Sequence, residues 1–237
     1  MHARDENEII SIPRPTLQRL PVYLRVLERC ISEGLRVVSS SELGRRSGID
    51  EYQVRKDLSA FYGGGRPGLG YDVFDLAEVI GNILGVNNLH EAILVGAGKL
   101  GCAIASYPGF QKFGLKIVAM FDNDPGKIGI RIGETLVLDI RKMPSLVRRL
   151  GIKMGIITTP AESAQKVADT MVSAGIEAIW NFAPTKLEVP DEVFVRQEDL
   201  ACGLATLAHH LAKKSRARRC GPAVTDDTSG AAPTTDG

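Results

Sequence analysis

The sequence has little cysteine and few aromatic residues, and it lacks a long apolar run. Its 4 cysteines form no Cys-x-x-Cys pair, and no group of cysteines and histidines has zinc-site spacing. We therefore expect free thiols in a reducing compartment and no bound metal. The absence of about 18 consecutive apolar residues excludes a spanning helix. Because the first residues are polar and acidic rather than built like a signal peptide, we expect a cytoplasmic protein with no membrane partner.

An excess of one charge sign is also missing. The chain has 29 basic and 28 acidic residues, giving a net charge of +1, which excludes a polycationic nucleic-acid coat. A local basic face is not excluded, because residues 12–66 hold ten Lys and Arg against six Asp and Glu. A length of 237 residues with 44% hydrophobic residues is enough for one large or two modest domains.

The first third of the chain has the signals of short helices. One helix is expected to begin at Pro21 and to end near Gly34. A second starts in Ser39-Ser40-Ser41 and ends near Gly48, and a third begins at Asp50, which serves as its cap. Two short helices joined through a tight glycine turn are typical of a helix-turn-helix.

A glycine-rich segment follows the helix-turn-helix region of about Val22 to Phe61. Residues 62–71 contain too many glycines for a helix or a regular strand, so we expect a flexible hairpin that carries Arg66. Residues 72–85 then form an amphipathic helix that bridges to the next domain. A helix-turn-helix followed by such a hairpin is the plan of a winged helix.

Five basic residues are the candidates for contact with DNA. Arg55 and Lys56 lie in the middle of the predicted recognition helix, where one is expected to read guanine edges and the other to contact phosphate. Arg45 and Arg46 are placed to clamp the DNA backbone nearby. Arg66, at the tip of the hairpin, is placed to enter a groove.

From His90 to about Lys214 the pattern changes to short apolar runs that alternate with amphipathic stretches. Strands separated by helices at this spacing predict an α/β fold with a doubly wound parallel sheet of Rossmann type. The expected strands are residues 92–95, 115–121, 156–158 and 178–182.

The strongest local signal is a Gly-x-Gly-x-x-Gly motif that directly follows a strand and opens a helix. Its glycines let the backbone approach a pyrophosphate, and the helix N-terminus offers free N–H groups. The motif predicts a dinucleotide site, NADH or NAD⁺, made by Gly96, Ala97, Gly98, Lys99, Leu100 and Gly101.

Asp122 ends the next predicted strand, 122 − 101 = 21 residues after the last motif glycine. This spacing matches the acidic residue that binds the adenosine ribose hydroxyls. Its charge repels a 2′-phosphate, so NAD(H) is favoured over NADP(H), although Lys127 is placed to soften that preference.

Two later strands end in further candidates for dinucleotide contact. Thr158, Thr159 and Pro160 follow one strand, and Asn181 and Phe182 end another. Open parallel sheets bind their ligands at the carboxyl ends of their strands, which is where these residues are expected.

No acid–base constellation accompanies the dinucleotide motif. The sequence has no evident Tyr-x-x-x-Lys, Ser-His-Asp or paired-histidine arrangement. A dinucleotide site without these groups indicates sensing rather than turnover, so we expect no catalytic residues and no enzyme activity.

The last predicted helix has one apolar stripe at helical spacing. It is expected to dock within its own domain or onto a second subunit. The stripe consists of Leu200, Leu204, Leu207, Ala208 and Leu211.

Taken together, these motifs resemble the redox-sensing transcriptional repressor Rex family of bacteria, over about Ile12 to Lys214. Their combination and order carry the resemblance. The motifs are Arg19–Arg25, Gln53–Ser59, Gly68–Tyr71, Gly96–Gly101, Tyr107–Phe110 and Asn181–Pro184.

The resemblance implies a homodimer in which the last helix is swapped into the partner subunit. It also implies that NADH releases double-stranded operator DNA, whereas NAD⁺ permits DNA binding. By motif, the family's inter-domain switch falls on Arg25, Tyr107 and Asp199. A two-fold dimer is expected to bind an inverted repeat.

The expected plan is therefore a flexible arm, a winged-helix DNA-binding domain with its bridging helix, a Rossmann NAD(H)-binding domain, a dimerisation helix and a disordered tail. The leading hypothesis is an NADH-responsive repressor that senses the NADH/NAD⁺ ratio. The alternatives are an NAD-dependent oxidoreductase or a CoA-binding subunit with a helical appendage. The segments of the plan are residues 1–11, 12–85, 86–197, 198–214 and 215–237.

Overall fold

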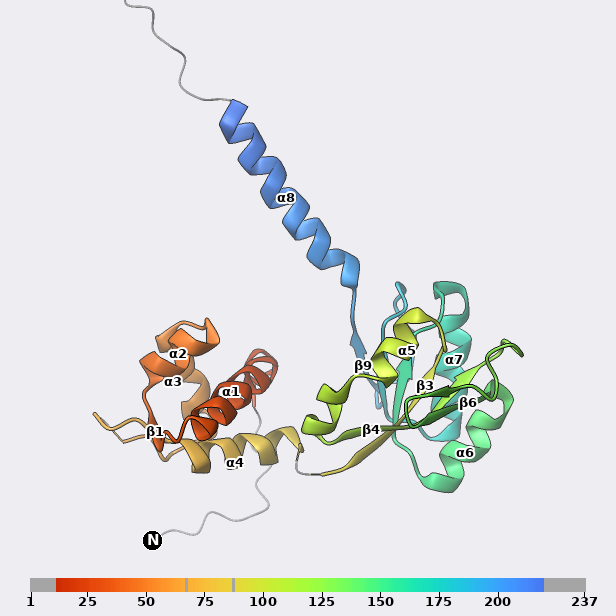
Figure 1. Cartoon of the computed structure of the whole chain (residues 1–237), viewed down its shortest axis with the longest axis horizontal. Helices are drawn as coiled ribbons and strands as arrows, with labels where there is room; N and C mark the ends of the chain where they lie inside the picture. The colour runs from red at the N-terminus through yellow and green to blue at the C-terminus, as the bar shows by residue number, and fades with distance from the viewer. Residues whose placement is uncertain (1–11, 67, 87, 220–237) are drawn as a thin grey trace, which may run out of the picture. The chain divides into compact units, whose positions relative to one another are not determined.

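The computed structural model describes residues 12–66, 68–86 and 88–219 (Figure 1), and the predicted arm lies outside them. Two compact units make up the chain. The first combines the residues up to Ile93 with Cys102–Met120 and Ile130–Leu136, and the second combines Leu94–Gly101, Phe121–Gly129 and the chain from Val137 onward.

The N-terminal part consists of helices and one small antiparallel sheet. β1 pairs with β2, with Val37 opposite Asp72 and Val38 opposite Tyr71. These two-residue strands were not predicted, because their pairing joins positions more than thirty residues apart in the sequence. The elements are α1 (Arg14–Ser32), β1 (Val37–Val38), α2 (Ser40–Ser47), α3 (Glu51–Ser59), β2 (Tyr71–Asp72) and α4 (Val73–Leu84).

Local capping sets the bounds of the short helices, as the sequence predicted. The Ser39 side chain accepts a hydrogen bond from Glu42 N at the start of α2, and Gly48 ends that helix in a left-handed conformation. Asp72 accepts from two backbone N–H groups at the start of α4, and Gly85 ends that helix in the same way as Gly48.

The start of α1 differs from the prediction, because the helix begins at Arg14 and Pro21 lies in its interior. Proline inside a helix removes a backbone hydrogen bond and costs about 3 kcal/mol in a helix without tertiary contacts. Burial offsets this cost, since Leu20, Tyr23 and Leu27 around Pro21 have no exposed surface. The helix starts instead at Pro13-Arg14-Pro15, where proline is tolerated.

The predicted hairpin is confirmed as a narrow wing. Arg66 N donates to Gly70 O at 2.9 Å, and Gly70 N donates to Arg66 O at 3.0 Å. Gly70 has φ +96°, and a Cβ there would meet Val38 O at 2.5 Å, so the close approach of the wing to β1 requires glycine.

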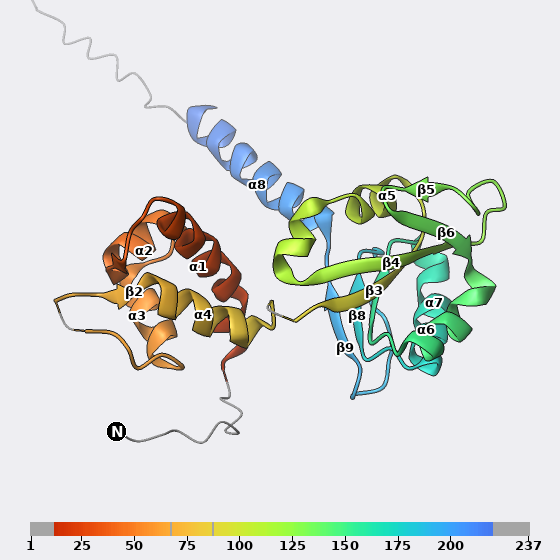
Figure 2. The same ribbon diagram turned by 60° about the horizontal axis from the view of Figure 1, so that its bottom comes forward.

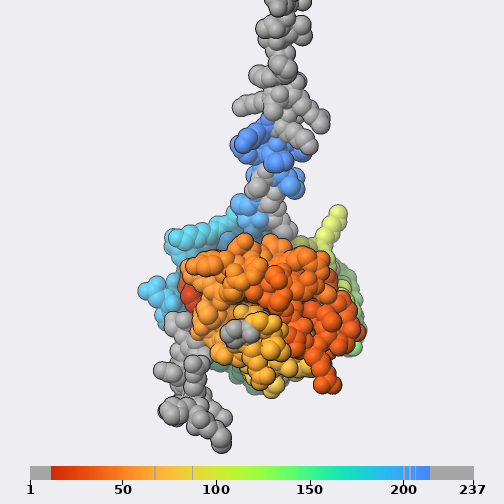
Figure 3. All heavy atoms as spheres, turned by 90° about the vertical axis from the view of Figure 1, so that its left-hand side faces the viewer, coloured from red at the N-terminus to blue at the C-terminus, as the bar shows by residue number. Residues whose placement is uncertain are grey.

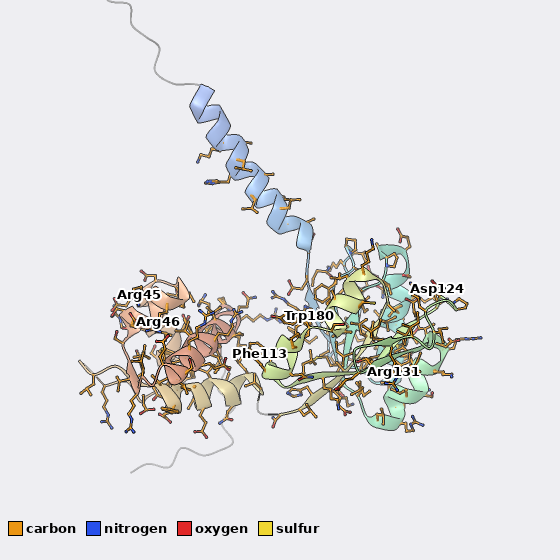
Figure 4. All side chains as sticks on the ribbon, in the orientation of Figure 1. Arg45, Arg46, Phe113, Asp124, Arg131 and Trp180 are labelled. Carbon is orange, nitrogen blue, oxygen red and sulfur yellow. The ribbon has the colours of Figure 1, made fainter. Side chains whose placement is uncertain are left out.

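One apolar core holds the N-terminal helices together. Its fully buried members include Leu20 and Leu27 from α1, Leu58 from α3 and Leu76 from α4. Phe113 (Figure 4), at the end of the short 3₁₀ helix η1 (Pro108–Phe113), packs against this core and belongs to the same compact unit.

A seven-stranded sheet forms the other part of the fold, in the order β5-β6-β4-β3-β7-β8-β9. β7, β8 and β9 pair in parallel, and only β5 is antiparallel to its neighbour within the described pairings. β3, β4, β7 and β8 confirm the predicted strands, whereas β5, β6 and β9 were not predicted. The strands are β3 (His90–Val95), β4 (Leu115–Asp122), β5 (Arg131–Ile132), β6 (Thr135–Asp139), β7 (Met154–Ile157), β8 (Ala178–Asn181) and β9 (Phe194–Gln197).

Helices cover the sheet in a doubly wound manner (Figure 2). The connection through α5 leads from β3 to β4, towards the β5 edge of the sheet. The connections through α6 and α7, which pack against each other, lead to β7 and then to β8, towards the β9 edge. Right-handed crossovers therefore place α5 on one face and α6 with α7 on the other. The direction of winding changes between β3 and β7, so their carboxyl ends meet at the usual ligand position of such folds. The helices are α5 (Lys99–Ala105), η2 (Ile140–Lys142), α6 (Met143–Leu150) and α7 (Ala161–Ala174).

The last helix, α8 (Leu200–Arg219), is longer than predicted. It enters the stretch 215–237, which was expected to be disordered, because Lys, Arg and Ala at 213–219 are good helix formers. Residues 220–237 lie outside the described part of the chain. Along the described helices, no segment is long and apolar enough to cross a membrane.

Candidate functional site

Two of the three glycines in the turn after β3 are required by sterics, and the third faces open space. Gly96 has φ +109°, and a Cβ there would meet Thr158 at 2.8 Å. A Cβ on Gly101 would overlap the carbonyl oxygen of Gly96, so α5 packs directly on the turn. A Cβ on Gly98 would meet nothing within 4 Å. The open side of the turn is thus at Gly98, where a pyrophosphate has free access to backbone N–H groups.

Asp122 ties the end of β4 to the glycine turn. Its Oδ2 accepts from Ala97 N at 2.7 Å, and its Oδ1 accepts from Asp124 N at 2.9 Å. Lys127 Nζ lies 3.2 Å from Oδ2. Burial alone would raise the pKa of Asp122, but hydrogen bonds from Asp124 N, Ala97 N and Lys127 outweigh it and lower that pKa. The carboxylate is therefore charged and adjoins the turn, and its predicted contact with a ribose stays a prediction.

The residues after β7 close the opposite side of the turn. Thr158 Oγ1 donates to Gly96 O at 2.8 Å. Thr159 Oγ1 is buried and has no hydrogen-bond partner among the described residues. Because buried hydroxyl groups are rarely left unpaired, this orphaned group is suited to a polar ligand group. Pro160 precedes α7 and is exposed.

Asn181 and Phe182 form part of a compact loop after β8. The side chain of Asn181 is fully buried, accepts from Ala183 N at 3.0 Å and donates to Gln197 Oε1 at 2.7 Å. Its polar atoms therefore brace the loop. The ring of Phe182 lies 4.8 Å from that of Trp180, which Figure 4 labels.

The exposed face of α3 carries the predicted recognition residues. Arg55 is 53% exposed, forms an ion pair with Glu51, and has its Nη1 3.4 Å from Ser40 Oγ. Lys56 is exposed beside it. Tyr52 is 70% exposed and lies three and four residues before them, on the same helical face. The sequence interpretation missed Tyr52, although its position in the first turn of a recognition helix was a signal.

α2 packs against α3. Figure 3 shows the surface of the N-terminal part, and Figure 4 labels the basic residues Arg45 and Arg46 of α2. Arg45 is 71% exposed and donates to Glu42 at 2.7 Å. Arg46 is only 24% exposed, because it donates to Glu33 at 2.6 Å and also pairs with Glu42. Arg46 therefore braces α2 against the end of α1, and its contact with DNA stays a prediction.

The wing and α3 enclose a hollow of about 440 Å³, lined among others by Arg55, Arg66, Ser40 and Leu69. Arg66 is exposed, and Leu69 is 65% exposed. The structure thus brings together two of the predicted DNA-contacting arginines from segments eleven residues apart.

A buried polar cluster anchors α3 to α1, and the sequence interpretation missed its role. Asp57 is 1% exposed. It accepts hydrogen bonds from Thr16, Arg19, Tyr23 and Gln53, at 2.6–3.0 Å. An acid at the third place after Val54, on the apolar face of the helix, was the available signal. The partners themselves were not predictable, since three of them come from α1.

The three predicted switch residues lie at exposed positions. Arg25 and Tyr107 belong to the same compact unit and line one hollow of about 490 Å³. Tyr107 is 58% exposed, and its ring packs edge-on to Phe110 with centroids 5.0 Å apart. Asp199 caps the start of α8 by accepting from Ala201 N at 2.8 Å.

Comparisons with known proteins match both parts of the chain. Residues 11–59 match the family described as "Putative DNA-binding protein N-terminus", and residues 87–185 match "CoA binding domain". The redox-sensing transcriptional repressor Rex of Chloroflexus aggregans is 43% identical over 204 residues, which cover 86% of this chain and 96% of the relative. Rex of Carboxydothermus hydrogenoformans is 45% identical over 201 residues, covering 85% and 97%. The chain belongs to the Rex family.

Solved structures of a Rex-family repressor named RSP agree with this assignment. Its complex with β-NAD⁺ and operator DNA matches with a TM-score of 0.82 and 36% identity, over 88% of this chain and 96% of that one. Its complex with β-NADH matches with a TM-score of 0.79 and 34% identity, over 89% and 99%.

Membership of the Rex family makes the chain a redox-sensing transcriptional regulator rather than an enzyme. The leading hypothesis from the sequence is thereby confirmed, and the oxidoreductase and CoA-binding alternatives are not favoured. Within the described residues, no three His, Cys, Asp or Glu side chains gather as a metal site.

Proposed function

We propose that this Rex chain works as a homodimer in the cytoplasm, binds an inverted-repeat operator in double-stranded DNA, and releases it on binding NADH. The RSP complexes with operator DNA, NAD⁺ and NADH support this choice of ligands. A two-fold dimer presents two recognition helices, and this geometry favours an inverted repeat.

The observation that carries the proposal is the open side of the glycine turn at Gly98. The unpaired buried hydroxyl of Thr159, which follows the Thr158 that packs on Gly96, supports it. In the proposal, residues 96–101 hold the pyrophosphate, and Asp122 binds the adenosine ribose. Residues 158–160 and Phe182 line the remainder of the site, and the buried Asn181 braces the loop that carries Phe182. When bound, the ligand supplies a nicotinamide ring that is charged in NAD⁺ and neutral in NADH.

DNA recognition is assigned to the face shared by α2, α3 and the wing. Arg55 and Lys56 divide base and phosphate contacts, Arg66 enters a groove, and Arg45 and Arg46 contact the backbone. In the free protein Arg55 pairs with Glu51, so DNA must compete with an exposed ion pair worth about 0.2–1 kcal/mol.

The dimer is assigned to α8, which has three largely exposed leucines among its described side chains. Leu204, Leu207 and Leu211 are 69%, 64% and 64% exposed and recur at helical spacing. An exposed apolar stripe of this kind marks an interaction surface. We assign residues 198–214 to swapping into a partner subunit. Residues 12–85 form the DNA-binding domain and residues 86–197 the dinucleotide domain.

The proposed switch between DNA binding and DNA release depends on the charge of the nicotinamide ring. Enclosing an unpaired charge in an apolar pocket is costly, so a closed dimer accepts NADH better than NAD⁺. In the closed state Asp199 pairs with the partner's Tyr107, and in the DNA-competent state with the partner's Arg25. Moving such an equilibrium from 1:99 to 99:1 requires about 5.5 kcal/mol of differential affinity.

A selection experiment tests the proposal. The purified chain is used to select duplexes from a library of random inverted repeats with NAD⁺ present, and the selected pool is then washed with NADH. We expect enrichment of one repeat and its elution by NADH. Enrichment of sequences without two-fold symmetry, or elution that does not depend on NADH, would contradict it.

A further inference from the structure

Lys127 occupies the acidic corner of the glycine turn. Its Nζ lies 3.2 Å from Asp122 Oδ2 and 3.7 Å from Asp124 Oδ2, and its side chain is 38% exposed. A turn fixes its backbone, because Lys127 N donates to Asp124 O at 3.0 Å and Gly126 N donates to Asp124 Oδ1 at 2.9 Å. The ammonium group is thus held beside the carboxylate assigned to the ribose.

The hydrogen-bonding capacity of Asp122 is nearly used up. Its Oδ2 accepts from Ala97 N and Lys127 Nζ, and its Oδ1 accepts from Asp124 N. With two lone pairs on each oxygen, one acceptor position on Oδ1 is left for a ribose hydroxyl. A ribose edge with two neighbouring hydroxyl groups therefore needs a second protein group.

Lys127 can make the additional hydrogen bond to the ribose that Asp122 cannot. An ammonium group has three N–H donors, and the two carboxylates engage two of them at most. The third is available to a ribose oxygen or to a phosphate placed there. The hydrogen bond with Asp122 raises the pKa of Lys127, so the ammonium form dominates at neutral pH.

The charge of the corner also depends on this lysine. Asp122 and Asp124 contribute two negative charges and Lys127 one positive charge, so the corner carries about −1. Without the lysine it would carry about −2, against a ribose 2′-phosphate that bears about −1.5 to −2 at pH 7. Lys127 therefore weakens the electrostatic exclusion of a 2′-phosphate.

We propose that Lys127 is a specificity-determining residue of the dinucleotide site, which binds the adenosine ribose together with Asp122 and limits the exclusion of NADPH. This inference rests on the proposed function, because it takes the site to bind NADH.

The test is a titration of the full chain and its Lys127→Gln variant with NADH and with NADPH. We expect the ratio of the NADPH Kd to the NADH Kd to rise about tenfold in the variant, because the cation that pairs with Asp122 and Asp124 is lost. Lys127→Arg keeps the charge and should leave the ratio within about threefold of wild type. Lys153→Gln is the matched control, since it removes a lysine whose Nζ pairs with Glu177 far from the turn in sequence, and its ratio should not change.

The outcomes separate the two claims. If wild type binds NADH and Lys127→Gln leaves the ratio unchanged, or lowers it, the role of Lys127 is wrong and the proposed function stands. If wild type binds neither dinucleotide, the proposed function fails and the inference fails with it. A rise in the ratio for Lys153→Gln as large as that for Lys127→Gln would show a general charge effect and would also overturn the inference.

Discussion

Arg19 of α1 donates to both carboxylate oxygens of Asp57 on α3, with Nε 2.6 Å from Oδ2 and Nη2 2.7 Å from Oδ1. This bidentate pair fixes α3, the proposed recognition helix, to α1, the longest helix of the N-terminal part. The side chain of Asp57 is 1% exposed, whereas that of Arg19 is 27% exposed. The buried carboxylate therefore needs the ion pair more than the partly solvated guanidinium does.

The first prediction concerns the stability of this attachment. Asp57→Asn should lower the free energy of unfolding by about 3 kcal/mol, because removing one partner of a buried ion pair leaves its donors uncompensated. Urea unfolding followed by circular dichroism measures the change. Glu177→Gln, which removes an exposed ion pair with Lys153, is the control and should cost less than about 1 kcal/mol. A loss of that small size for Asp57→Asn would show that the cluster does not anchor α3.

The same cluster predicts a pH dependence. Burial alone would raise the pKa of Asp57, but hydrogen bonds from Arg19, Tyr23, Gln53 and Thr16 lower it to about 2, from an ordinary value of 3.8. A depressed carboxyl pKa contributes stability that is present above the unfolded value and is lost as the pH falls through the folded value, here about 2 kcal/mol. The difference between wild type and Asp57→Asn should therefore be full above about pH 4 and should shrink towards pH 2. A constant difference over that range would contradict the assignment.

Two glycine-to-alanine substitutions in the turn should affect different properties, one the binding of NADH and the other the stability of the fold. Gly98→Ala adds a methyl group to open space, so stability should change little while the NADH Kd rises at least about tenfold, because the backbone can no longer approach the pyrophosphate. Gly101→Ala would overlap Gly96 O and should cost about 1–3 kcal/mol of stability. Thermal melts and NADH titrations of both variants decide this. Unchanged NADH affinity in Gly98→Ala would mean that no ligand enters over the turn.

DNA recognition predicts two classes of defect on α3. One of the variants Arg55→Ala and Lys56→Ala should lose a base contact. That variant should bind the operator about 1–3 kcal/mol more weakly and should show relaxed specificity at one base position. The other should lower the salt slope by roughly one unit for each copy in contact. Glu51→Gln, which frees Arg55 from its ion pair, should strengthen binding modestly. Wild-type affinity and salt slope in both alanine variants would show that α3 does not enter the major groove.

The switch prediction separates the charge of Asp199 from its role as a helix cap. Asp199 accepts from Ala201 N at 2.8 Å, and asparagine caps a helix equally well. Asp199→Asn should therefore keep α8 intact and still blunt the release of operator DNA by NADH. Operator release measured against NADH concentration tests this, with circular dichroism as the check on helix content. Release at the wild-type NADH concentration would remove Asp199 from the switch.

The sequence predicted the elements whose signals are local. The starts and ends of α2 and α4 follow from cap residues such as Ser39 and Gly85, and the glycine turn follows from its own spacing. The sequence also placed Asp122 at the end of β4, whereas its hydrogen bond with Ala97 N was not predicted.

The features that the sequence did not predict depend on distant partners. The two-residue strands β1 and β2 form by pairing with each other. The start of α1 depends on the burial of the residues around Pro21. Asp57 lies on the apolar face of α3, and its role was missed because nothing in the sequence indicated that Arg19 and Tyr23 would meet it. Packing between residues far apart in the sequence determines these features.

The NADH-dependent release of DNA is tested most directly by the affinity of the full chain for its selected inverted repeat, measured by fluorescence anisotropy with saturating NADH and with saturating NAD⁺. We expect NADH to raise the Kd for DNA at least about tenfold and NAD⁺ to leave it within about twofold of the ligand-free value. Equal effects of the two dinucleotides, or no effect of either, would contradict a repressor that senses the NADH/NAD⁺ ratio.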